Sequence, residues 1–188
     1  DVYAFTVEVP QGASEVVAEF KFLSSQGAQG RVVMTPDMLN LQWNANSLYP
    51  AGVITRNIQA QATVTLPPGW SYATALDTER RDGDTVVFKP ISYDHLVDSP
   101  LFAGRHFQRF DLDPGAKVPV HLNVFADEAK SWAAKPEQIQ ANRALVQQMY
   151  KLDGARHFDR YEFLLALTDR LGGIGLEHQR SSENSGDT

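Results

Sequence analysis

A glycine-rich run near the C-terminal end contains the residues best suited to chemistry. The run covers residues 172–183, reads GGIGLEHQRSSE, and directly follows a strongly apolar segment, 161–167. Glycine allows another backbone to approach closely, and a carboxylate such as that of Glu177 can hold a cationic group through a charge-assisted hydrogen bond. The alternative is an ordinary glycine-rich turn with a solvated Glu177 and His178, because short motifs often occur by chance.

The elements before residue 127 show the alternation of apolar and polar residues that is typical of half-buried strands. An Asp82-Gly83 pair between two such stretches predicts a hairpin. Several short strands separated by proline and glycine predict a mainly β fold, an antiparallel β-sandwich. The alternating stretches are 3–9, 16–22, 39–43, 58–66 and 118–126.

The pattern changes after residues 127–135, which we take as a domain boundary. Pro136 begins a helical pattern that runs to about Asp153 and ends at Gly154, since proline suits a first helical turn and glycine a helix end. An apolar strand-like segment, 157–168, leads into the glycine-rich run. We therefore predict domains at 1–127 and 128–188, and a polar, mobile tail from Ser181 onwards.

Composition excludes several functions. The 188 residues carry a net charge of −6 without a basic block, which argues against binding to nucleic acid or an anionic membrane. No apolar run approaches the roughly 20 residues of a membrane-spanning helix. The absence of cysteine removes thiolate chemistry and Cys-type zinc sites. None of the five histidines begins an H-E-x-x-H motif, so we predict no catalytic residue and no metal ligand in this chain.

The run at 172–183 resembles the signature of the glycyl aminopeptidase family of zinc metallopeptidases. These are gluzincin-type enzymes that usually carry a PDZ domain downstream. The resemblance extends over most of the chain, although its upstream segments are less specific, because turn-rich aromatic motifs recur in many β-proteins. The family's H-E-x-x-H is absent, so the chain resembles a fragment that ends before this motif. The upstream segments are Trp43 with 48–52, 66–70, 93–100 and 104–107.

The resemblance implies a β-sandwich followed by the start of an α+β, thermolysin-like catalytic domain. The parent would be a zinc-dependent aminopeptidase that releases small N-terminal residues, glycine or alanine, from peptides. Zinc is implied for the parent and not for this fragment, which we expect to be inactive. An exported bacterial enzyme, periplasmic or secreted, is favoured.

The resemblance also assigns site residues. Glu177 would bind the free α-amino group of a peptide substrate, and Gly173 and Gly175 would expose backbone groups to it. His178 matches the same pattern and is assigned to the substrate-binding residues. It would either form a hydrogen bond near Glu177 or support the loop. Residues 181–183 match without an assigned role. The fragment could also associate with itself or with the missing catalytic half.

A non-catalytic β-sandwich module that binds a glycan or a protein partner is the alternative. Four aromatic residues could form a carbohydrate-binding platform, although packing in the sandwich core is the favoured interpretation. They are Trp43, Tyr49, Trp70 and Tyr72.

Overall fold

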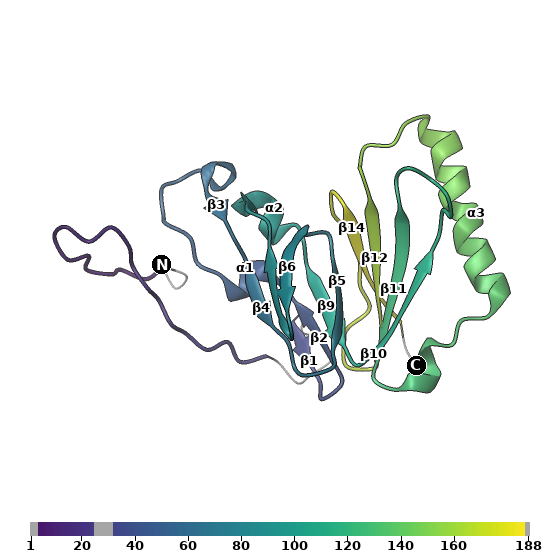
Figure 1. Ribbon diagram of the computed structural model, residues 1–188, viewed down its shortest axis with the longest axis horizontal. Coiled ribbons are helices and arrows are strands. Elements are labelled where there is room, and N and C mark those ends of the chain that lie inside the picture. Colours follow the sequence, from purple (N-terminus) through teal and green to yellow (C-terminus); the bar gives the residue numbers. More distant parts are fainter. Residues whose placement is uncertain (1–3, 25–31, 187–188) are drawn as a thin grey trace.

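The computed structural model describes residues 4–24 and 32–186, which build a mainly β molecule as predicted. Figure 1 shows two strand-rich halves side by side, with one long helix on the outer face of the second half. An extended N-terminal segment runs away from the first half. None of the helices in the described ranges has the length and apolar character needed to cross a bilayer.

The first half is a sandwich of antiparallel sheets. One layer is a four-stranded sheet in the order β1-β2-β9-β5. The facing layer contains a three-stranded sheet, β4-β7-β6, and the pair β3-β8. The strands are β1 (Val33–Met34), β2 (Met38–Leu41), β3 (Gln59–Ala60), β4 (Thr63–Thr65), β5 (Ser71–Thr74), β6 (Thr78–Asp82), β7 (Thr85–Phe88), β8 (Ile91–Ser92) and β9 (Leu101–Gly104).

Short helices close one side of this sandwich. They are α1 (Trp43–Asn46), the 3-10 helix η1 (Thr55–Asn57) and α2 (Tyr93–Val97). The core between the layers includes the buried side chains of Trp43, Trp70 and Phe88. The predicted hairpin at Asp82-Gly83 is confirmed, because β6 and β7 pair across a turn in which Gly83 has a positive φ of 57°.

The second half is a five-stranded mixed sheet in the order β10-β11-β12-β14-β13. The three inner strands are parallel, and both edge strands are antiparallel to their neighbours. One face packs on the four-stranded sheet through Phe102, Phe125 and Leu164. The strands are β10 (His106–Asp111), β11 (Val120–Ala126), β12 (Tyr161–Leu167), β13 (Gly175–Glu177) and β14 (Ser181–Gly186).

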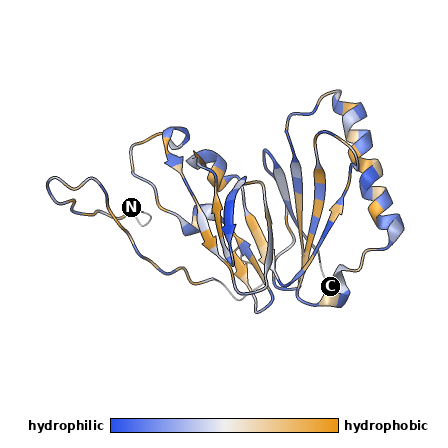
Figure 2. Ribbon diagram, viewed as in Figure 1, coloured by the Kyte–Doolittle hydropathy of each residue, from blue (hydrophilic) through white to orange (hydrophobic). Residues whose placement is uncertain are grey.

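The opposite face carries the long helix α3 (Pro136–Asp153), which follows the 3-10 helix η2 (Ala129–Trp132). The predicted helix is confirmed: proline stands in its first turn, and Gly154 ends it with a φ of 64°. Val146 of α3 is buried against β11. Figure 2 shows hydrophobic residues concentrated in the strands of both halves, whereas α3 alternates between hydrophilic and hydrophobic positions.

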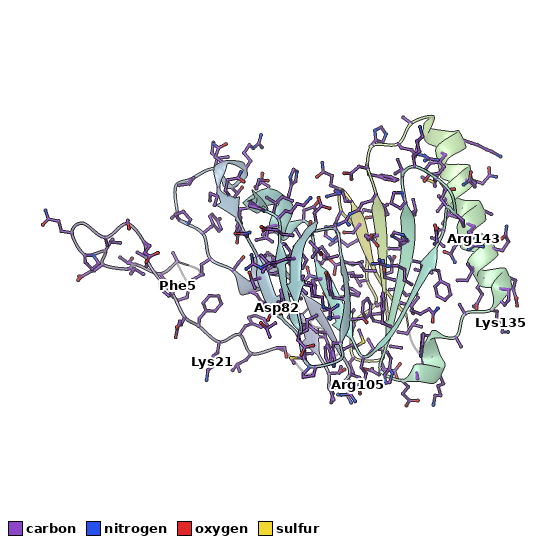
Figure 3. The ribbon with its side chains drawn as sticks, in the orientation of Figure 1. Phe5, Lys21, Asp82, Arg105, Lys135 and Arg143 are labelled. Atoms are coloured by element: carbon purple, nitrogen blue, oxygen red, sulfur yellow. The ribbon has the colours of Figure 1, made fainter. Side chains whose placement is uncertain are left out.

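The strands predicted for 3–9 and 16–22 are wrong for the part of these ranges that the structure describes; Tyr3 lies outside it. Residues 4–24 contain no strand. The alternating side chains stand in solvent, and Phe5 is 77% exposed. Figure 3 shows Phe5 and Lys21 on this segment, clear of the sheets. An alternating pattern forms a strand only where a neighbouring strand takes up its backbone groups, and 4–24 has no such neighbour.

The mobile tail predicted from Ser181 is also wrong. Ser181 begins β14, which lies inside the sheet between β12 and β13. Its polar side chains are buried at Ser181, Ser182 and Glu183. Composition misleads here because the strand is enclosed between two neighbouring strands, and its buried carboxylate, Glu183, meets polar partners from other elements.

The stretch 58–66, predicted as a single strand, forms two strands that belong to different sheets, β3 and β4. Strands β10 and β11 pair with the C-terminal strands rather than with the sandwich. The change from one set of sheets to the other therefore falls between Gly104 and His106, and Figure 3 places Arg105 near the junction of the two halves. The boundary after residue 127 stays a prediction.

Candidate functional site

Strand β13 leaves one side of its backbone open. Among the strands of the described residues it pairs with β14 alone, as the edge strand of its sheet. The His178 N–H donates to the Ser181 carbonyl at 2.8 Å, and the Ser185 N–H donates to the Ile174 carbonyl at 3.1 Å. In an antiparallel pair, alternate residues bond to the partner, so the backbone groups of the residues between them point outward. Those of Gly175 and Glu177 therefore face the open edge.

Two of the four predicted site residues, Gly175 and Glu177, lie on this edge, and Gly173 lies two residues before the strand begins. Gly173, Gly175 and Glu177 are exposed. A Cβ added at Gly173 or Gly175 would meet no atom within 4 Å, so the space beside the edge is open. The edge thus offers backbone donors and acceptors next to one exposed carboxylate.

His178, the fourth predicted residue, does not lie on the open edge. Its side chain is only 8% exposed, because successive side chains of a strand point to opposite faces and His178 points toward the sandwich. Its Nδ1 lies 3.0 Å from Asp98 Oδ1 and its Nε2 lies 2.9 Å from Glu183 Oε1. His178 therefore contacts other protein groups and supports the loop.

Electrostatics around His178 favour the charged ring. Burial lowers the pKa of His178, but hydrogen bonds to Glu183 and Asp98 and the negative charges of both carboxylates outweigh this and raise the pKa above its ordinary value of 6.5. Nearby, burial raises the pKa of Tyr161, a hydrogen bond with Ser182 opposes this, and the negative charges of Glu177 and Asp98 add to the rise. Glu177 is thus close enough to influence the first residue of β12.

Sequence reasoning missed the residues that hold His178. Glu183 is fully buried, and it accepts hydrogen bonds from the side-chain amides of Gln42 and Asn40. Asp98, at the end of α2, also accepts from the backbone N–H of Gln179 at 2.9 Å. Glu183 lies in the glycine-rich run 172–183, five positions after His178, but the amides that donate to it come from distant parts of the sequence.

Two hollows lie beside the β13–β14 hairpin. One, of about 290 Å³, separates β13 from α1 and α2 and is lined by Leu176, His178 and Asp94 among others. The other, of about 380 Å³, lies at the hairpin tip and is lined by His95, His157 and Arg180 among others. Both hollows lie where the hairpin meets the sandwich.

The described residues do not fit a zinc ion. Within 4–24 and 32–186, no group of three or more His, Asp or Glu side chains has a geometry that could hold a metal. The described side chains alone therefore do not form a complete zinc site.

The aromatic residues proposed as a glycan platform do not share one surface. Trp43 and Trp70 are buried in the sandwich core, and the Trp43 indole donates to the Ser99 carbonyl at 2.8 Å. Tyr72 packs partly buried against the same core, whereas Tyr49 is exposed. Three of the four residues thus serve packing.

Comparison with known families identifies the first half. The model of the peptidase M61 N-terminal domain matches residues 1–105, which is more than half of the chain. The chain therefore belongs to the peptidase M61 family through this N-terminal domain. The match ends where the sandwich gives way to the five-stranded sheet.

A solved structure with a TM-score above 0.5 supports this fold. An aminopeptidase N family protein from Idiomarina loihiensis superposes with a TM-score of 0.68 at 19% identity, over 84% of this chain and 26% of that one. An M1 zinc metallopeptidase from Deinococcus radiodurans gives a TM-score of 0.44 at 16% identity, over 85% of this chain and 37% of that one. The chain thus spans about a quarter of the first relative's length. No match was found among curated proteins.

Proposed function

We propose that this chain is part of a zinc-dependent aminopeptidase that releases small N-terminal residues such as glycine or alanine. In this proposal β13 binds the peptide substrate, and Glu177 binds its free α-amino group. Membership of a peptidase family supports the proposal, as does the glycyl aminopeptidase resemblance of residues 172–183.

The observation that carries the proposal is the open edge of β13. An extended peptide can add to a free strand edge through main-chain hydrogen bonds. The outward backbone groups of Gly175 and Glu177 offer such bonds, and the glycine leaves room for the incoming chain. The exposed Glu177 carboxylate stands beside this edge and would favour a peptide that ends in an ammonium group.

The chemistry of bond cleavage lies outside the described residues. A zinc ion in the parent enzyme would act as a Lewis acid on the scissile carbonyl and activate a water molecule. The described side chains provide no site for it, so we assign to this chain only the binding and orientation of the substrate. We expect no aminopeptidase activity from the 188-residue chain alone; zinc-dependent hydrolysis by the purified chain would contradict this.

The test is a Glu177→Gln variant of the full-length enzyme, with Glu137→Gln as the control. Glu137 is an exposed carboxylate in the first turn of α3. We expect kcat/KM for alanine p-nitroanilide to fall about 10- to 100-fold in Glu177→Gln, the loss of one hydrogen bond to a charged group. The preference over N-acetylalanine p-nitroanilide should fall equally. Unchanged preference would refute the anchoring role.

The proposed parent also predicts an exported location and a peptide as the partner. Association with the remaining catalytic part, or with a second copy, is part of the same proposal, because the outer face of β11 and β12 beside α3 carries partly buried apolar side chains such as Phe163. Sedimentation of the chain at several concentrations measures association with a second copy. A monomer at all concentrations would exclude it.

A further inference from the structure

The first step is the burial of Glu183 in the middle of a sheet. Its side chain is fully buried, in contact with the neighbouring layer through Asn40 and Gln42. Removing a carboxylate from water costs several kcal/mol of solvation, and this cost is offset only where the group is paired and hydrogen-bonded. The two amides are neutral donors, so His178 at 2.9 Å is the partner that can compensate the charge.

The second step is the geometry of the His178 ring. Both ring nitrogens face carboxylate oxygens, at 3.0 Å on the Asp98 side and 2.9 Å on the Glu183 side. A neutral imidazole carries one N–H and can donate at only one of these positions, whereas the imidazolium donates at both. An ionised Asp98 and an ionised Glu183 are both satisfied only when the ring is charged.

The third step is what these contacts join. Asp98 ends α2 in the first half of the molecule, and Glu183 lies on β14 in the second. His178 itself lies between β13 and the turn that leads into β14. Asp98 also accepts from the Gln179 backbone N–H, so one carboxylate receives two bonds from the hairpin. The ring therefore fastens the hairpin to the sandwich at the residue next to Glu177.

We propose that His178, as an imidazolium bridging Asp98 and Glu183, is the positioning residue that holds the edge strand β13 against the sandwich. The bridge fixes the hairpin and, through it, the direction in which Glu177 and the outward backbone groups face. Loss of the ring proton removes one of the two bonds and loosens the hairpin.

The surrounding charges set the direction of the pH dependence. Asp94 of α2 lines the adjoining hollow together with His178, and Gln42 before α1 contributes a neutral amide to Glu183. The carboxylates in contact with the ring are Asp98 at the end of α2 and Glu183 on β14. These negative charges favour the imidazolium, in keeping with the raised pKa of His178. The bridge is therefore complete below the ordinary pKa of 6.5 and is lost as pH rises through the raised pKa of the folded protein.

The first test follows the titration of the unsubstituted protein and uses one variant only to assign the signal. In the 188-residue chain, NMR titration of the histidine Cε1–H signals should show one histidine that titrates above 6.5, identified by its loss in His178→Gln. Over the same pH range, the exchange protection of the Gln179 amide, corrected for the intrinsic rate, should fall about tenfold for each unit above that pKa. A His178 that titrates at or below 6.5, or constant Gln179 protection, would overturn the proposal.

The second test compares variants at pH 6, where the bridge is complete. His178→Gln should lower the protection of the Gln179 amide about tenfold and abolish its pH dependence. His157→Gln makes the same change at an exposed histidine and should alter neither quantity. Glu183→Gln should shift the titration of His178 downward, because it removes one of the two negative charges. Equal effects of His178→Gln and His157→Gln would contradict the bridge.

The effect on a substrate rests on the proposed function, whereas the titration and the exchange do not. If Glu177→Gln leaves substrate preference unchanged while Gln179 protection follows the charge of His178, the peptidase proposal fails and the bridge stands. If Glu177→Gln acts as expected while Gln179 protection ignores pH, the bridge fails alone.

Discussion

Residues 4–22 carry large apolar side chains that are exposed, whereas strand β14 carries polar side chains, several of which are buried. The N-terminal segment alternates large apolar side chains, and these are exposed: Phe5 by 77% and Val17 by 79%. Strand β14 reads SSENSG, and Ser181, Ser182 and Glu183 are buried. Figure 2 shows the same contrast, with hydrophobic colour on the N-terminal segment and almost none on β14.

The difference teaches that neighbours for the backbone decide which segment becomes a strand. β14 pairs with β12 on one side and β13 on the other, so its N–H and C=O groups are satisfied. Its one buried charge meets His178, Gln42 and Asn40. Residues 4–24 have no strand beside them in the described structure, and hydrophobic pattern alone does not supply one.

Removing the buried carboxylate should have the largest effect. We expect Glu183→Ala to lower the free energy of unfolding by about 4 kcal/mol, since it leaves a buried imidazolium and two buried amides without their acceptor. Urea denaturation at pH 6 measures this change. The matched control is Glu177→Ala, an exposed carboxylate on the adjacent strand, which should change the free energy by less than about 0.5 kcal/mol. If Glu183→Ala and Glu177→Ala lowered the free energy of unfolding equally, the Glu183 carboxylate would not be buried as described.

A cavity made at Leu164 of β12 should cause the next largest loss of stability. Leu164 on β12 is fully buried between the two halves, against Phe102 and Phe125. Leu164→Ala should destabilise the protein by about 3 kcal/mol through lost burial and a residual cavity. Thermal unfolding followed by circular dichroism would detect it, and a loss below about 1 kcal/mol would mean that the sheets do not pack face to face.

The start of β14 offers a smaller effect. The Tyr161 hydroxyl donates to the Ser181 carbonyl at 2.8 Å. Tyr161→Phe removes this bond and keeps the ring packed on Phe158, so we expect a loss of about 1 kcal/mol. Tyr72→Phe, which removes an exposed bond to Thr78, is the control and should cost less. Equal costs would argue against a specific bond at the start of β14.

The smallest effect is expected at the N-terminal segment. Phe5→Ala should change the free energy of unfolding by less than about 0.5 kcal/mol, because the side chain is exposed. The same urea experiment measures it. A loss comparable to that of Leu164→Ala would show that this segment packs against a surface in solution.

Some elements could be predicted from local pattern alone. Helix α3 has a proline in its first turn, Gly154 at its end and apolar residues on one face, and each signal is local. The hairpin at Gly83 and strand β11 follow in the same way. The split of 58–66 into β3 and β4 could not be predicted, since its two halves pair with strands from different sheets.

The candidate site likewise contains residues that the sequence alone indicates and residues that it does not. Gly173, Gly175 and Glu177 stand out by residue type and spacing; all three are exposed, and the last two belong to the edge strand β13. The role of Glu183 depends on Gln42, more than a hundred residues earlier in the chain. No local signal marks such a pair, so a polar composition suggested a tail where the fold has an inner strand.

The order of strands along the chain also constrains how the protein is made. Strand β13 leaves the ribosome before β14, yet β14 is its one neighbour among the strands that the structure describes and lies between it and β12. The edge that carries Glu177 therefore cannot form until residues 181–186 have been synthesised and have paired in parallel with β12. During translation the edge strand β13 is the last part of this sheet to be paired, so its open edge is presented only after β14 has joined β12.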